Sequence, residues 1–190
     1  METVIKKSTM TNSIDVTQLL DLVEQVQNNP EFGKFSFRTA NKWQDGTMSH
    51  ATVKEYYGAL QNDTERPVFG FDIDEPPILL GKNLGANPVE YLLVGLSGCL
   101  TTAIVVEAAT QGIHLDSVES TIEGALDLRG FLGLAPDIPV GYQRIKVRFK
   151  IDAEIKDEKK QELIDQACKS SPSLDTIVNP VQVDIELVNH

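Results

Sequence analysis

Residues 87–99 read Asn-Pro-Val-Glu-Tyr-Leu-Leu-Val-Gly-Leu-Ser-Gly-Cys, and this stretch decides the fold. Asn87 can cap a helix, Pro88 suits the first helical position, and the Glu90 carboxylate can reach back to the Asn87 amide. Apolar residues continue on all sides of the helix until Gly112 supplies an end. The pattern predicts a long helix that is enclosed by protein and forms the core.

The charge-free part of this helix is too short for a membrane span. It covers residues 91–106, 16 residues between Glu90 and Glu107, whereas a span needs ~20 apolar residues. Residues 1–8 carry charges but no apolar run, so no signal or transit peptide is readable there. We therefore expect a soluble, cytoplasmic protein with no membrane partner.

Composition narrows the class further. The chain has 190 residues, of which 41% are hydrophobic and 24% charged, and this is typical of a globular domain. The net charge of −11 repels phosphate backbones, so we expect no nucleic-acid partner. Two cysteines and three histidines show no C-x-x-C or H-x-x-x-H spacing, so we expect no metal and no bound cofactor.

The remaining pattern predicts an α+β fold with a largely antiparallel sheet. Helical spacing of apolar residues marks an N-terminal helix over 14–26, capped by Ser13 or Asn12, and a second helix capped by Asp157. We divide the chain into a helical extension, 1–30, and a single domain, 31–190. Alternating apolar residues predict strands over 35–43, 47–56, 67–73, 118–128, 145–151 and 181–187.

Cys99 lies on a strip of small residues along the long helix. Packing is one interpretation, because a free cysteine behaves as a small hydrophobe. The other is a peroxidatic thiolate, which needs a nearby cation because the helix N-terminus is about three turns away. Cys168 is the other thiol, and it lies on an apolar helical face, where it either packs or forms a disulfide with an oxidised Cys99.

The segment from Asn87 to Leu93, followed by Gly95 and Ser97-Gly98-Cys99, resembles the Asn-Pro-x-Glu-Leu-Leu…Cys helix of the OsmC/Ohr-like proteins. The resemblance extends over about residues 38–188. It implies an antiparallel sheet wrapped on a long buried central helix, in an intertwined homodimer with each site at the subunit boundary. In the active branches it implies a two-cysteine thiol peroxidase that acts on organic hydroperoxides.

The resemblance also assigns residues. Cys99 is its peroxidatic cysteine, and Arg38, with Lys42 as the second choice, is the candidate for the arginine that stabilises the thiolate. Two positions depart from the pattern: Val89 replaces a glutamate ten residues before the first cysteine, and Ser171 replaces a cysteine before the proline. Cys168 lies three residues earlier, about one helical turn away, where a resolving role is still geometrically possible.

These residues leave two functional hypotheses. In the first, a redox protein reduces small-molecule hydroperoxides: Cys99 attacks, Arg38 supports the thiolate, and Cys168 or an external thiol reduces the sulfenate. In the second, a non-catalytic homodimer binds a small apolar ligand in the same interface pocket, and Cys99 packs. The loop 128–134 is unusually apolar, and we expect it to contact the second subunit.

Overall fold

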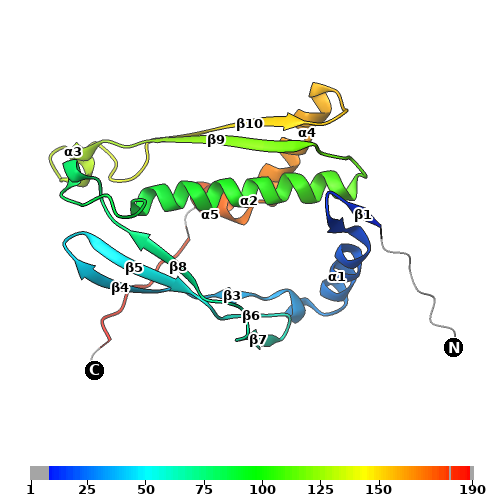
Figure 1. Cartoon of the computed structure of the whole chain (residues 1–190), viewed down its shortest axis with the longest axis horizontal. Helices are drawn as coiled ribbons and strands as arrows, with labels where there is room; N and C mark the ends of the chain where they lie inside the picture. Colours follow the sequence, from blue (N-terminus) through cyan, green and yellow to red (C-terminus); the bar gives the residue numbers. More distant parts are fainter. Residues whose placement is uncertain (1–8, 180, 189–190) are drawn as a thin grey trace. The chain divides into compact units, whose positions relative to one another are not determined.

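The computed structural model describes residues 9–179 and 181–188. The chain divides into two compact units, Met1–Leu92 and Leu93–His190 (Figure 1). The division falls inside the long helix. The predicted division into an extension, 1–30, and a domain, 31–190, stays a prediction.

The first unit opens with α1 (Val16–Asn28). It follows a small antiparallel pair formed by β1 (Met10–Thr11) and β2 (Ile14–Asp15). The predicted helix is confirmed but its predicted cap is wrong: Asp15 accepts hydrogen bonds from the first turn, whereas Asn12 and Ser13 have positive φ and form the β1–β2 turn. A short 3-10 turn, η1 (Pro30–Gly33), follows.

Two three-stranded antiparallel sheets complete the strands of this unit. The predicted hairpin is confirmed over residues 40–53, where β4 and β5 pair, and the predicted strand 67–73 is present as β8. Residues at both ends of the hairpin instead join the other sheet. The first sheet contains β4 (Ala40–Asp45), β5 (Met48–Val53) and β8 (Phe69–Ile73), and the second contains β3 (Ser36–Phe37), β6 (Tyr56–Gly58) and β7 (Gln61–Asp63).

A buried carboxylate organises the loop that leads from β8 to the long helix. Asp74 is 2% exposed and accepts hydrogen bonds from the Thr47 hydroxyl at 2.6 Å and from the backbone N–H groups of Glu75, Lys82 and Leu84. The loop includes the 3-10 turn η2 (Pro77–Leu79). Because all these donors favour the charged form, the side chain fixes the loop best when it is ionised.

Asp74→Asn is therefore expected to lower the melting temperature of the first unit at neutral pH. The hydrogen bond from Thr47, helped by the three backbone donors and opposed by burial, lowers the pKa of Asp74 to about 2. A lowered folded-state pKa stabilises above the unfolded value of about 3.9 and is lost as the pH falls toward 2. Thermal unfolding should therefore show a difference between wild type and variant that shrinks across this window, and a difference independent of pH would contradict the assignment.

The long helix is present as α2 (Pro88–Thr110). Its predicted capping box is confirmed: the Asn87 N–H donates to the Glu90 carboxylate and the Glu90 N–H donates to the Asn87 side chain, both at 2.8 Å. Gly112 ends the helix with φ of 68°, a conformation that favours glycine. Both ends of the helix are therefore encoded locally.

The second unit packs a hairpin and the helix α4 with the C-terminal part of α2 (Figure 1). β9 (Ser117–Ala125) and β10 (Arg144–Asp152) pair antiparallel over their whole length, which confirms the predicted pair. α4 (Asp157–Ser170) follows, and Lys156 rather than Asp157 stands at its cap position. The buried cluster at the centre consists of Ile104, Ile151, Ala153 and Ala167.

Two short helices were not predicted. α3 (Leu128–Phe131) begins where the sequence indicated that the strand continues, because Asp127 caps it by accepting from the Arg129 N–H. α5 (Pro172–Val178) begins at the proline that was expected only to stop the preceding helix. Proline does both, since it cannot continue a helix but suits the first position of a new one.

Two other expectations are wrong for the single chain. Residues 181–188 form no strand, because alternation supplies only propensity and a strand also needs a neighbouring edge to pair with. The long helix is not enclosed on all sides: Leu96, Leu100 and Ile104 are buried, while Leu92 and Val94 are 46% and 59% exposed. A substantial apolar surface is left open on the helix.

Candidate functional site

Cys99 lies in the middle of α2, half-buried, as a free thiol. The Ser171 hydroxyl donates a hydrogen bond to its sulfur, with 3.2 Å between Oγ and Sγ. Ser171 is the N-cap of α5 and is 2% exposed. Both residues belong to the second unit, so the fold of that unit brings the hydroxyl to the thiol across 72 positions of sequence.

The surroundings of Cys99 favour its thiolate. Burial raises the pKa of the thiol, but the hydrogen bond from Ser171 and those from the backbone N–H and the side chain of Ser173 outweigh it, so the pKa lies below its ordinary value. Hydrogen bonds to the charged form of an acid have this effect. Among the residues that the structure describes, no side-chain cation contributes to the lowering. The thiolate is the form of cysteine that attacks electrophiles.

Cys168 has a different environment. It lies in the last turn of α4, is exposed, and is also a free thiol. The expectation that it packs on the apolar face of this helix is wrong, because that face is formed by the buried Leu163 and Ala167. Partial desolvation of the sulfur, and then the charge of Asp165, raise the pKa of the Cys168 thiol. The two thiols are therefore shifted in opposite directions.

Arg38 and Lys42 belong to the first unit, whereas both cysteines belong to the second. Arg38 is exposed in the link between β3 and β4, just after the strand on which it was predicted. Lys42 is exposed on β4. Their predicted role at the thiolate stays a prediction.

The sequence reasoning missed Ser171 and Ser173 as neighbours of the reactive sulfur. In the sequence, Ser171 stands out as the residue that replaces the cysteine before the proline. A signal for it existed, since Ser171-Pro172 is the pattern of an N-cap followed by the first helical position. That pattern predicts a hydroxyl oriented by the helix start, but neither its burial nor the side chain that it faces.

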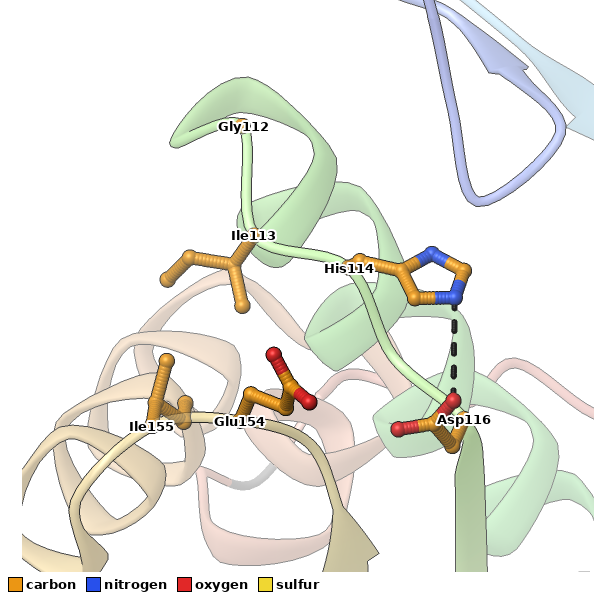
Figure 2. A pocket seen from close by; sticks show the side chains of 6 residues that line it. All are labelled: Gly112, Ile113, His114, Asp116, Glu154 and Ile155. Carbon is orange, nitrogen blue, oxygen red and sulfur yellow. Dashed lines mark ion pairs between the residues drawn. The ribbon is translucent and has the colours of Figure 1, made fainter.

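A separate pocket of about 470 Å³ opens at the end of α2, and neither cysteine lines it (Figure 2). His114 and Asp116 face one another at its rim, with 3.7 Å between Nε2 and Oδ1. Within residues 9–179 and 181–188, no group of three or more His, Cys, Asp or Glu side chains is placed to hold a metal ion. The pocket therefore has the carboxylates of Asp116 and Glu154 in its lining. Its lining residues are Gly112, Ile113, His114, Asp116, Glu154 and Ile155.

The family model described as OsmC-like protein matches residues 81–186, more than half of the chain. The chain belongs to the OsmC-like family. Its matched segment includes the capped helix, Cys99, Ser171 and Cys168. The resemblance of residues 87–99 to this family is thereby confirmed.

Solved structures of OsmC-like proteins share the fold of this OsmC-like chain, with mixed α/β content and antiparallel sheets. An OsmC-like protein from Mycoplasma pneumoniae superposes with a TM-score of 0.60 and 17% identity, covering 76% of this chain and 89% of that one. An organic hydroperoxide resistance protein from Legionella pneumophila gives a TM-score of 0.52 and 22% identity, covering 75% and 90%. At these identities the likeness establishes the fold alone.

A curated relative is much longer. Over 113 residues the chain is 31% identical to a protein named ABC-type transporter MDR1 from Aureobasidium melanogenum, and the match covers 55% of this chain but 8% of that protein. The chain therefore corresponds to a small part of it. In this OsmC-like chain α2 is long and apolar enough to cross a membrane by length and composition, a test that the core helix of a soluble protein also passes.

Proposed function

We propose that this OsmC-like chain reduces organic hydroperoxides, with Cys99 as the nucleophile. The observation that carries the proposal is the contact between Cys99 and Ser171, which favours the thiolate. Structural neighbours from Legionella pneumophila and Elizabethkingia anophelis are named organic hydroperoxide resistance proteins. An oxidised Cys99 is then returned to the thiol by Cys168 or by an external thiol.

The reaction of the thiolate is an attack on the O–O bond. The Cys99 sulfur bonds to one oxygen of the hydroperoxide, the O–O bond breaks, and the leaving alkoxide takes up a proton to become the alcohol. Sulfur is oxidised to a sulfenic acid and the hydroperoxide is reduced. The step needs the hydroperoxide and one proton, and no metal or bound cofactor.

Intact-mass analysis after one equivalent of cumene hydroperoxide tests the proposal. The enzyme is expected to gain about 16 Da, as a sulfenic acid, or to lose two hydrogens, as a disulfide. Cys99→Ser should abolish either change. An unchanged mass, with a Cys99 thiol that resists alkylation in the folded protein, would favour the non-catalytic binding protein instead.

We further propose that the active form is an intertwined homodimer in which the sheets wrap on α2 as a central helix. Exposed apolar side chains support it, both on the helix, at Leu92 and Val94, and around α3, at Phe131 and Leu134. Apolar patches of this kind mark interaction surfaces. The loop 128–134 would contact the second subunit, and the site would lie at the subunit boundary.

Sedimentation should therefore give twice the 20.9 kDa mass of one chain. Val94→Lys is expected to shift the protein toward the monomer, because the lysine replaces a valine that is 59% exposed in one chain and would be covered in the proposed dimer. Val68→Lys changes a valine of similar exposure, 57%, in the first unit and serves as the control. A monomer for the unmodified protein at micromolar concentration would refute the dimer.

We place the protein in the cytoplasm, with residues 31–190 as the functional domain and 1–30 as an added helical segment.

Arg38 is proposed to support the thiolate, because a guanidinium favours a neighbouring anion. Arg38→Ala should then lower hydroperoxide turnover, whereas equal turnover in Arg38→Ala and Lys42→Ala would remove both residues from the site.

A further inference from the structure

The hydroxyl that faces the Cys99 sulfur is held in place from two sides. Ser171 lies between α4 and α5, where Ser170 ends the first helix and Pro172 begins the second. Its Oγ donates to Sγ of Cys99 at 3.2 Å and accepts from the Leu174 N–H at 3.3 Å. The side chain is also 2% exposed, so water does not compete for it.

The contact with Leu174 decides where the Ser171 hydrogen points. A serine hydroxyl has one hydrogen and two lone pairs. Because the Leu174 N–H occupies a lone pair of Oγ, the hydroxyl hydrogen is directed to the other neighbour, which is the sulfur. The cap of α5 therefore pre-orients a donor toward Cys99 before any substrate arrives.

We propose that Ser171 is a positioning residue that holds the Cys99 thiolate and its sulfenic acid. In the same proposal, the site works with a single reactive cysteine, and its reductant is an external thiol. The part concerning the sulfenic acid rests on the proposed function. The part concerning the thiolate depends on the hydrogen bond alone.

The chemistry of the neighbours favours this single-cysteine route. A hydroxyl cannot form a disulfide, so Ser171 can hold an oxidised Cys99 but cannot reduce it. Cys168 is exposed in α4, but partial desolvation of its sulfur and then the charge of Asp165 raise the pKa of its thiol, which reduces the fraction present as the attacking thiolate. Cys99 is only half-buried, so an external thiol would reach its sulfur through the exposed part of the side chain.

The reductive half-reaction balances with two external thiols. The first attacks the sulfenic sulfur, forms a mixed disulfide with Cys99 and releases water. The second attacks the external sulfur of that mixed disulfide, leaves as a symmetric disulfide and returns the Cys99 thiol. Two thiols are oxidised for each hydroperoxide reduced.

The pH dependence of alkylation by iodoacetamide tests the positioning role. In a Cys168→Ser background only Cys99 reacts. Ser171→Ala is expected to raise the midpoint of the rate profile by ~1 pH unit, since the donor that favours the thiolate is removed. Ser171→Thr keeps the hydroxyl and should keep the original midpoint.

Ser170→Ala is the matched control, because the Ser170 hydroxyl donates to the carbonyl oxygen of Gln166 in its own helix. It should leave the midpoint unchanged. Circular dichroism establishes that each variant is folded. Equal midpoints for Ser171→Ala and the Cys168→Ser parent would overturn the positioning role.

Ser171→Cys, again with Cys168→Ser, tests the geometry even if the alanine variant fails to fold. A sulfur at this position should form an internal disulfide with Cys99 on treatment with diamide, seen as the loss of two hydrogens. A thiol that stays reduced, or that forms only intermolecular disulfides, would show that residue 171 does not face the sulfur.

Oxidation of the wild type distinguishes this inference from the proposed function. With one equivalent of cumene hydroperoxide we expect a gain of about 16 Da, and a dimedone adduct at Cys99 that Cys168→Ser does not change. The loss of two hydrogens, abolished by Cys168→Ser, would overturn the single-cysteine route and leave the peroxidase intact. No reaction would refute the proposed function, while the alkylation result would still decide the role of Ser171.

Discussion

Cys99→Ser is expected to lower hydroperoxide turnover by about 1,000-fold or more, as the loss of an enzyme nucleophile does. A serine hydroxyl is almost fully protonated at neutral pH and does not attack an O–O bond. The fold should survive, because the two side chains are similar in size and the new hydroxyl can still accept from Ser171. Turnover is measured as peroxide consumed in the presence of dithiothreitol.

Cys168→Ser is the matched control for this experiment. It also removes one thiol, but from an exposed position in the last turn of α4. The single-cysteine route predicts turnover within about twofold of wild type. If Cys99→Ser kept its turnover, the reactive sulfur would lie elsewhere and the proposed function would be wrong.

The parts of the fold that the sequence predicted are those encoded by neighbouring residues. The capping box at Asn87 and Glu90 needs only residues three apart, and it formed as expected. The β9–β10 pair follows from alternation on both strands, because one face of each is buried against the second unit's own core. In both cases the structure that neighbouring residues favour is also the structure present in the packed unit.

The missed hairpin shows where local signals fail. β6 and β7 are joined by Ala59 and Leu60, which both have positive φ, 51° and 64°. Such turns are normally announced by glycine, asparagine or aspartate. Here the pairing of the strands imposes a conformation that neither residue favours, so no sequence pattern marks the turn.

The candidate site was predicted in part. Cys99 could be singled out because its helix motif is local, and the family comparison confirmed that motif. Ser171 could not be placed beside it, because 72 positions separate the two residues and only tertiary packing joins them. The same limit applies to residues 181–188. Their alternating pattern indicates that they could form a strand, but it does not indicate which strand edge they would pair with.

The largest effect on stability is expected from Ile104→Ala. Ile104 is 0% exposed and belongs to the buried cluster with Ile151, Ala153 and Ala167. Removing its three outer carbons leaves a cavity that these neighbours cannot fill, and such substitutions cost about 2–5 kcal/mol. Since a whole domain is stable by about 5–15 kcal/mol, the denaturant midpoint should fall markedly.

Val178→Ala is the control, because it also removes apolar carbons but from a side chain that is 61% exposed on α5. Its effect should stay within about 0.5 kcal/mol. The comparison also tests whether α2, which is long and apolar enough to cross a membrane, is the core helix of a water-soluble unit. A helix that is the core of a water-soluble unit makes Ile104→Ala far more damaging than Val178→Ala in detergent-free buffer, whereas equal effects would show that Ile104 does not pack in that core.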